Sequence, residues 1–139
     1  MPLRVVVDRN VYISTLIGGE VGKLRPRLFS ESVRLVISER LLAEIADVGS
    51  RSHLVRYLNA AQLQKFLDLL RDAGEFTEDP SSSTAISRDA DDDYLLALAK
   101  AAKADVLLTG DKDLLVLGKH GRTRIMNARS FAKEFLSGK

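Results

Sequence analysis

Residues 3–10, LRVVVDRN, place an apolar run directly before an acid, a base and an amide. Branched apolar residues at successive positions are typical of a strand that is buried on both faces, as in a parallel sheet. We therefore predict a buried strand over 3–8. Local stability does not require that strand to end on the polar groups Asp8, Arg9 and Asn10, so its end is a candidate functional site.

The same signals predict further strands along the chain, separated by segments with helical periodicity. The additional strands are expected at 33–38, 104–109 and 122–126. Helices are expected at 39–48, 59–74, 89–103 and 130–136, with shorter helical or turn segments at 11–19, 23–31 and 113–117. This alternation predicts an α/β fold in which a mainly parallel sheet is flanked by helices on both faces. We treat residues 1–139 as one domain.

The composition limits the class of protein and the kinds of site. Of 139 residues, 45% are hydrophobic and 29% are charged, as in soluble globular proteins. Cysteine is absent, which excludes disulfides, thiolate zinc sites and cysteine nucleophiles. No apolar run reaches the length of a membrane span and no signal-peptide pattern is present, so we expect a cytoplasmic protein without a membrane partner. The net charge of +2 argues only weakly for a polyanionic partner.

Acidic residues follow two of the predicted strands. Asp8 ends the first, and Thr109, Asp111 and Asp113 lie at or just past the end of the strand at 104–109. The carboxyl ends of parallel strands meet at one edge of an α/β sheet, where ligands bind. We therefore expect these side chains to lie at the same edge.

Two predicted helices each offer a further acid toward this edge. Glu44 lies beside the apolar stripe that contains Leu41 and Val48, where a charge loses water unless something replaces it. Asp92 heads the apolar face of the helix at 89–103, because the residues three, four and seven positions later are all apolar. Asp93 is next to it and stays a second candidate in that turn.

Four carboxylates that meet in one pocket repel one another unless a cation neutralises them. The four are Asp8, Glu44, Asp92 and Asp111. Oxygen ligands without cysteine, and without a spaced histidine pair, favour Mg²⁺ or Mn²⁺ over zinc. Such an ion near basic side chains suits phosphodiester cleavage, with Asn10 and Thr109 orienting ligands and Lys112 meeting the nucleic-acid backbone.

The order of four motifs resembles that of the PIN-domain ribonucleases, especially the bacterial VapC-like toxins of toxin–antitoxin pairs. The motifs are VVVDRN (5–10), SERLLAEI (38–45), DADDDYLLALA (89–99) and VLLTGDKDLL (106–115). The resemblance implies a metal site on Asp8, Glu44, Asp92 and Asp111, with Asp113 as a frequent addition. It also implies Mg²⁺ or Mn²⁺, hydrolysis of single-stranded RNA, a homodimer, and a small antitoxin protein as partner.

Arg9 departs from the family, which usually has a small hydroxyl residue between the first acid and the amide. Adjacent positions at the end of a strand point in opposite directions, so Arg9 need not enter the metal cluster. Two outcomes follow. Arg9 either contacts an RNA phosphate or pairs with a carboxylate of the site and weakens metal binding.

Three other functions share parts of this pattern. A phosphatase of the haloacid-dehalogenase kind needs an acid two positions after its nucleophile, where this chain has Asn10. A signalling receiver domain needs an aspartate at the end of a middle strand, where this chain has Ser38 and Glu39. The third is a degenerate PIN module that binds RNA or a partner without cleavage, with Arg9 as the lesion.

Overall fold

A computed structural model describes residues 2–51, 54, 56–80 and 90–135, and at positions 90–92 only the backbone. The strands are β1 (Leu3–Val7), β2 (Val33–Ile37), β3 (Glu75–Phe76), β4 (Val106–Leu108), β5 (Lys119–His120) and β6 (Thr123–Met126). The helices are α1 (Arg9–Ile17), α2 (Gly19–Gly22), α3 (Arg25–Leu28), α4 (Glu39–Gly49), α5 (Ala60–Ala73), α6 (Ala90–Ala101), α7 (Lys112–Leu115) and α8 (Ala128–Phe135).

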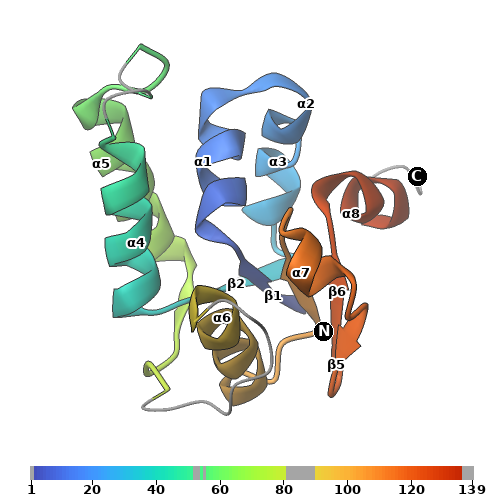
Figure 1. Ribbon diagram of the computed structural model, residues 1–139. Coiled ribbons are helices and arrows are strands. Elements are labelled where there is room, and N and C mark those ends of the chain that lie inside the picture. Colours follow the sequence, from blue (N-terminus) through green and yellow to red (C-terminus); the bar gives the residue numbers. More distant parts are fainter. Residues whose placement is uncertain (1, 52–53, 55, 81–89, 136–139) are drawn as a thin grey trace.

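The strands form one six-stranded sheet in the order β3-β2-β1-β4-β6-β5. All of its pairs are parallel except β5–β6, which is antiparallel. Figure 1 shows α1, α2 and α3 on one side of the sheet and α6 on the other. The predicted α/β fold with a mainly parallel sheet between helices is therefore confirmed.

The core explains why the apolar runs form these strands. Val5, Val6 and Val7 of β1 are fully buried, as are Leu107 and Leu108 of β4. A strand covered by helices on both faces has no polar side, so its sequence is apolar at successive positions rather than alternating. The unbroken apolar run of β1 is therefore explained by its central position, where both faces of the strand are buried.

Helix boundaries follow local signals in the sequence. Ser38 caps α4, because its hydroxyl accepts a hydrogen bond of 3.1 Å from the backbone N–H of Leu41. Gly74 ends α5. Gly18 ends α1 with a φ of 115°, a conformation that L side chains rarely adopt.

Two short strands and several element boundaries differ from the sequence prediction. The edge strands β3 and β5 have two residues each, which is too short to leave a periodic pattern. The segment at 23–31 is helical only over 25–28, where α3 has a proline in its first turn. The first strand ends at Val7, one residue earlier than predicted.

Among the described residues, no helix combines the length and the apolar character needed to cross a membrane.

Candidate active site

Asp8 ends the central strand and begins the next helix. Its carboxylate accepts a hydrogen bond of 3.1 Å from the backbone N–H of Asn10 and so caps α1. The side chain is only 7% exposed. The sequence pattern predicts Arg9 as a residue at the end of a strand. In the structure Asp8 is the helix cap, so Arg9 is instead the first residue of α1. The side chain of Asn10 is exposed, and the hydrogen bond that Asn10 donates to Asp8 comes from its backbone N–H.

Thr109 joins the ends of β1 and β4. Its buried hydroxyl donates a hydrogen bond of 2.8 Å to Asp8 Oδ2 and accepts one of 3.1 Å from the backbone N–H of Asp111. Asp111 in turn caps α7, with its Oδ1 accepting a bond of 2.8 Å from the N–H of Asp113. The two acidic stretches thus lie at one edge of the sheet, as the strand ends predicted.

This edge lies where the order of the strands changes direction. The chain runs from β1 to β2 on one side of β1, and it returns later as β4 on the other side. In open α/β sheets, this switch point is where ligands bind, because the loops at the carboxyl ends diverge there. Asp8 and Asp111 therefore lie at the position in the sheet where open α/β folds bind ligands.

The other predicted acids lie in the first turns of α6 and α7. Asp92 lies in the first turn of α6, but its side chain falls outside the described part of the chain, so its role in the site stays a prediction. Asp93 is only 8% exposed. Lys112 and Asp113 are exposed in the first turn of α7.

Glu44 lies at the edge of the buried face of α4, as its spacing predicted, and its carboxylate is held by two arginines. One oxygen is 3.1 Å from the guanidinium of Arg9, and the other is 2.9 Å from Nε of Arg40. The side chains of Glu44 and Arg9 are 20% and 23% exposed, so both are half-buried. The sequence allows two outcomes for Arg9, either contact with an RNA phosphate or pairing with a carboxylate of the site. In the structure it pairs with the carboxylate of Glu44.

The donor chemistry of the strand ends fits a hard divalent cation. Asp8, Asp111 and Thr109 offer oxygen atoms only, which Mg²⁺ and Mn²⁺ prefer. Among the described residues, however, no group of three or more acids and histidines is close enough to hold a metal ion. The carboxylate of Glu44 is occupied by guanidinium groups, and Asp92 lies beyond the described side chains.

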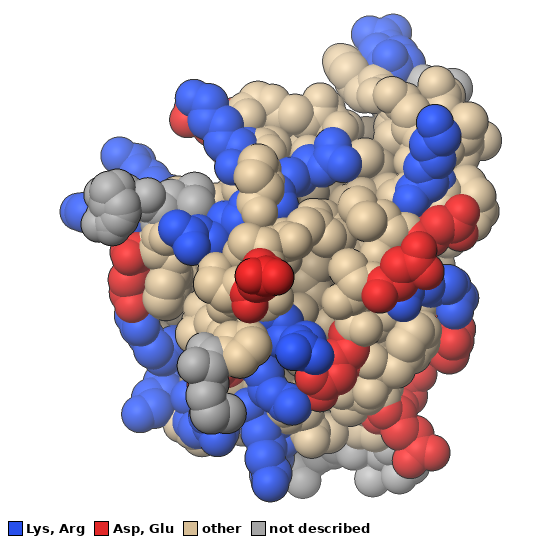
Figure 2. Space-filling model, turned by 180° about the vertical axis from the view of Figure 1, so that it is seen from behind, with Lys and Arg blue, Asp and Glu red and all other residues tan. Residues whose placement is uncertain are grey.

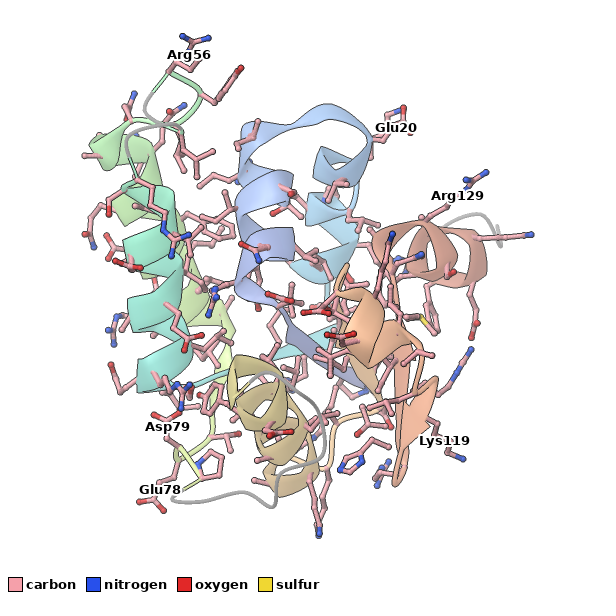
Figure 3. All side chains as sticks on the ribbon, viewed as in Figure 1. Glu20, Arg56, Glu78, Asp79, Lys119 and Arg129 are labelled. Carbon is pink, nitrogen blue, oxygen red and sulfur yellow. The ribbon has the colours of Figure 1, made fainter. Side chains whose placement is uncertain are left out.

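A buried polar network that the sequence did not reveal supports Arg40. The hydroxyls of Ser38 and Tyr94 are 2.5 Å apart, and Tyr94 donates a short hydrogen bond to Asp79. Asp79 also accepts a bond of 3.1 Å from the N–H of Arg40, whose guanidinium stacks 3.9 Å from the centre of the Tyr94 ring. Figure 3 shows Asp79 beside the beginning of α4, near α6. Tyr94 lies among apolar residues of α6 and reads as core in the sequence.

The same network changes two pKa values. Burial raises the pKa of Tyr94, and the hydrogen bond to Asp79 raises it further. Burial alone would raise the pKa of Asp79, but hydrogen bonds from Tyr94, Ser38 and the backbone of Arg40 outweigh burial and lower it. Asp79 is therefore held as a carboxylate and Tyr94 as a neutral phenol.

A hollow of about 360 Å³ opens beside Glu44. Its charged lining residues are Arg9, Arg40, Glu44, Asp47 and Arg51. Arg51 pairs with Asp47 at 3.3 Å. Among the described residues, the lining of this hollow thus has three arginines and two acids, a composition that suits a phosphate group.

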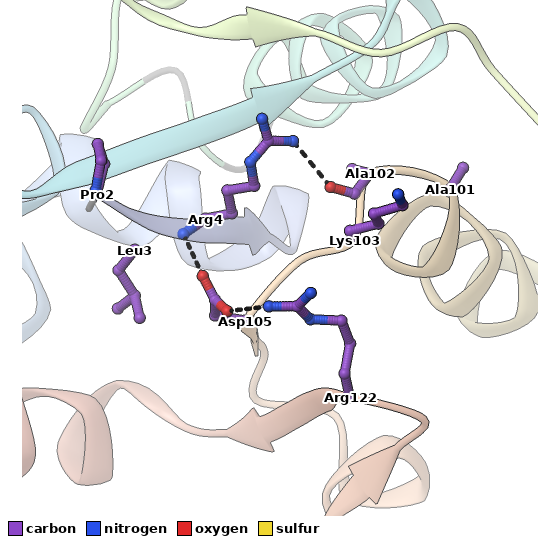
Figure 4. A pocket seen from close by; sticks show the side chains of 8 residues that line it. All are labelled: Pro2, Leu3, Arg4, Ala101, Ala102, Lys103, Asp105 and Arg122. Carbon is purple, nitrogen blue, oxygen red and sulfur yellow. Dashed lines mark hydrogen bonds and ion pairs between the residues drawn. The ribbon is translucent and has the colours of Figure 1, made fainter.

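A larger hollow of about 730 Å³ lies at the opposite, amino-terminal edge of the sheet. Figure 4 shows that Asp105 accepts hydrogen bonds from the backbone N–H of Arg4 and from the side chain of Arg122, while Arg4 also bonds the carbonyl of Ala102 at the end of α6. Arg4 is paired with Glu75 as well. These contacts tie the ends of elements together, so we do not place the active site there.

On the face of the molecule seen in Figure 2, the described charged side chains do not form a single basic area. Figure 2 shows acidic and basic side chains interspersed on the back of the molecule. The hollow beside Glu44, with its three arginines, carries the more specific signal for an anionic ligand.

Comparison with known proteins supports this view of the fold. Residues 4–113 match the family model described as the PIN domain. The chain is similar in structure to PAE2754 from Pyrobaculum aerophilum, with a TM-score of 0.61 and 14% sequence identity, over 95% of this chain and 88% of that one. That identity is low, so this likeness concerns the fold alone. A search of curated proteins gave no match.

Proposed function

Because the chain belongs to the PIN-domain family, we propose that it is a divalent-metal-dependent endoribonuclease that hydrolyses single-stranded RNA. PIN domains are generally nucleases, and those nucleases typically use divalent metals. The observation that supports the proposal best is the hydrogen-bonded link from Asp8 through Thr109 to Asp111 at the switch point of the sheet. This link fixes two acids at the position where α/β proteins bind their ligands.

In this proposal, Mg²⁺ or Mn²⁺ would be held by acids from both strand ends and from two helices. The proposed ligands are Asp8, Glu44, Asp92, Asp111 and Asp113. A divalent cation bound there would acidify a water molecule and neutralise negative charge on the scissile phosphate. Thr109 would keep the Asp8 carboxylate in position, since its hydroxyl is already bonded to that group. Asp93 would support the first turn of α6.

The substrate would be bound through its phosphates. Lys112 is exposed and directly follows Asp111 in the sequence, and Arg9 directly follows Asp8 and pairs with Glu44. Asn10 has an exposed amide that can orient a ligand. Hydrolysis would form a bond between phosphorus and the oxygen of water and break the bond to the leaving oxygen of the next nucleotide.

One observation favours a second candidate, a PIN module that binds RNA or a partner without cleaving it. Both oxygens of Glu44 are engaged by Arg9 and Arg40, so a proposed ligand is occupied. If the arginines never release Glu44, the remaining acids would hold a cation less tightly.

The experiment is cleavage of a labelled single-stranded RNA with Mn²⁺ or Mg²⁺, with EDTA as the reversal. We expect cleavage that EDTA abolishes, and we expect Asp8→Asn to lose at least about 100-fold in rate, because a metal contribution of several kcal/mol depends on its ligands. Circular dichroism would check that the variant is folded. Cleavage that persists undiminished in rigorously metal-free protein would refute the proposal, whereas RNA binding without any cleavage would favour the second candidate.

We also propose a biological setting, which is the toxin of a toxin–antitoxin pair. The protein would act in the cytoplasm as a homodimer, and a small antitoxin protein would neutralise it. A short upstream open reading frame whose product co-purifies with this chain and inhibits cleavage is the expected result. Light scattering would measure the oligomeric state.

A further inference from the structure

The carboxylate of Glu44 is already neutralised by residues of its own chain. Arg9 approaches one of its oxygens at 3.1 Å from α1, and Arg40 approaches the other at 2.9 Å from the preceding turn of α4. Because the carboxylate is half-buried, it has lost part of its water, and the two guanidinium groups replace that water.

The two arginines come from different elements and have different described contacts. The guanidinium of Arg40 stacks on the Tyr94 ring at 3.9 Å, and the Arg40 backbone N–H is bonded to Asp79. Arg40 is thus held by the Ser38–Tyr94–Asp79 network. Arg9 reaches across from α1 to Glu44 of α4, and in the sequence it directly follows Asp8, the N-cap of α1.

If Glu44 is a metal ligand, as the proposed function has it, a divalent cation and Arg9 would require the same carboxylate. Two positive groups cannot both take the Glu44 oxygen that faces Arg9, and a cation close to Arg9 would also repel it. A guanidinium displaced from Glu44 would remain in a hollow that already holds Arg40 and Arg51, where a phosphate is the group that matches its charge and forked geometry.

We propose that Arg9 competes with the divalent cation for Glu44, and that the displaced guanidinium then binds a phosphate of the nucleic acid. Cation and nucleic acid consequently bind with positive cooperativity, since each favours the state in which the Arg9–Glu44 pair is open. This inference rests on the proposed metal-dependent function and adds a regulation of that site.

The test measures Mn²⁺ affinity by isothermal titration calorimetry, which does not depend on cleavage. We expect Arg9→Ala to bind Mn²⁺ about fivefold more tightly than the wild type, within the usual range for coupled sites. The matched control is Arg51→Ala, which removes the same charge from the same hollow but from a pair with Asp47. We expect the control to leave Mn²⁺ affinity within about twofold of the wild type.

A second measurement tests the cooperativity. The affinity of a fluorescent single-stranded 2′-O-methyl oligonucleotide is measured by anisotropy with and without Mn²⁺, and its integrity is checked on a gel. We expect Mn²⁺ to strengthen oligonucleotide binding in the wild type by more than in Arg9→Ala, because only the wild type has a guanidinium to release.

The outcomes separate this inference from the function on which it rests. If Mn²⁺ binds the wild type and Arg9→Ala equally, or binds the variant more weakly, the competition is overturned while a metal-dependent nuclease remains possible. If Arg51→Ala gains as much Mn²⁺ affinity as Arg9→Ala, the change is a general effect of removing a positive charge, and the competition is likewise overturned. If neither protein binds Mn²⁺, both the inference and the proposed function fail.

Discussion

The hydroxyl of Thr109 donates a hydrogen bond of 2.8 Å to the carboxylate of Asp8, across a sequence separation of 101 residues. Both groups are buried, and they belong to the ends of the adjacent strands β1 and β4. The backbone continues the same connection, since the N–H of Asp8 bonds the carbonyl of Leu108 at 2.9 Å. The candidate site is therefore a direct extension of the strand pairing.

Replacing Thr109 by valine keeps the shape of the side chain and removes the bond to Asp8. We expect Thr109→Val to lower the free energy of unfolding by about 1–2 kcal/mol, because a buried carboxylate loses a partner. We also expect at least about a tenfold loss of RNA cleavage, equivalent to about 1.4 kcal/mol in the barrier. Urea unfolding and cleavage rates are the measurements.

Thr123→Val is the matched control for that substitution. Thr123 is equally buried, and its hydroxyl donates a bond of 2.8 Å to the carbonyl of Ala104, away from the acids. Its loss should reduce stability by a similar amount and leave cleavage unchanged. If both variants lose activity equally, the effect of Thr109 is one of stability only.

Removing the hydroxyl of Tyr94 breaks the network under Arg40. We expect Tyr94→Phe to destabilise the protein by about 1–3 kcal/mol at pH 7, because Ser38 and Asp79 each lose a partner. The lowered pKa of Asp79 contributes stability that is present above the unfolded pKa of about 4 and is lost as the pH falls through the folded value. The difference in the free energy of unfolding between Tyr94→Phe and the wild type should therefore become smaller in acid. Urea unfolding at several pH values measures this difference.

The exposed Tyr57 provides the control for this hydroxyl, since Tyr57→Phe makes the same change on the surface. We expect a change within about 0.5 kcal/mol. If the stability difference between Tyr94→Phe and the wild type stays constant from neutral to acid pH, Asp79 does not contribute to it.

Tyr12 presents the opposite case, a hydroxyl that costs stability. Its side chain is fully buried against Phe66, and its oxygen has no hydrogen-bond partner among the described residues. An unsatisfied buried hydroxyl is unfavourable, so we expect Tyr12→Phe to raise the free energy of unfolding by about 1 kcal/mol. A thermal or urea unfolding curve measures this. A loss of stability instead would indicate that the hydroxyl is satisfied, for example by a buried water.

Alkaline pH should unfold the protein through its buried phenols. Burial raises the pKa of both Tyr12 and Tyr94. Above the unfolded pKa of about 10, the unfolded chain has released these protons and the folded chain retains them, so stability falls as the pH rises. Melting temperatures from pH 9 to 11.5 should decline, and less steeply in Tyr12→Phe. Parallel declines in both proteins would exclude a contribution of Tyr12.

The sequence predicted the parts of the site that follow from strand pattern. Apolar runs before Asp8 and Thr109 identify buried parallel strands, and parallel strands bring their carboxyl ends to one edge. The position of Glu44 on its helix followed from the spacing of Leu41 and Val48. The pairing of Glu44 with Arg9 and Arg40 could not be predicted in this way. A long arginine side chain can reach several neighbours, and the sequence left two outcomes open for Arg9.

Other features leave no local signal. The Tyr94–Asp79 contact joins an apolar stripe of α6 to a segment without periodicity, and only the tertiary structure brings them together. The strand pair β5–β6 and the short β3 are set by pairing with a neighbour rather than by their own residues.

The interleaved order of the strands has a consequence for the newly made protein. A nascent chain that ends before β4 already carries Asp8 and Glu44, yet the strand that must dock beside β1 has not been synthesised. Long-range pairing of this kind is completed late, after the intervening segment has been ordered. Any reactivity of this edge that requires β4 beside β1 therefore arises only after the segment up to Leu108 has been synthesised and has folded.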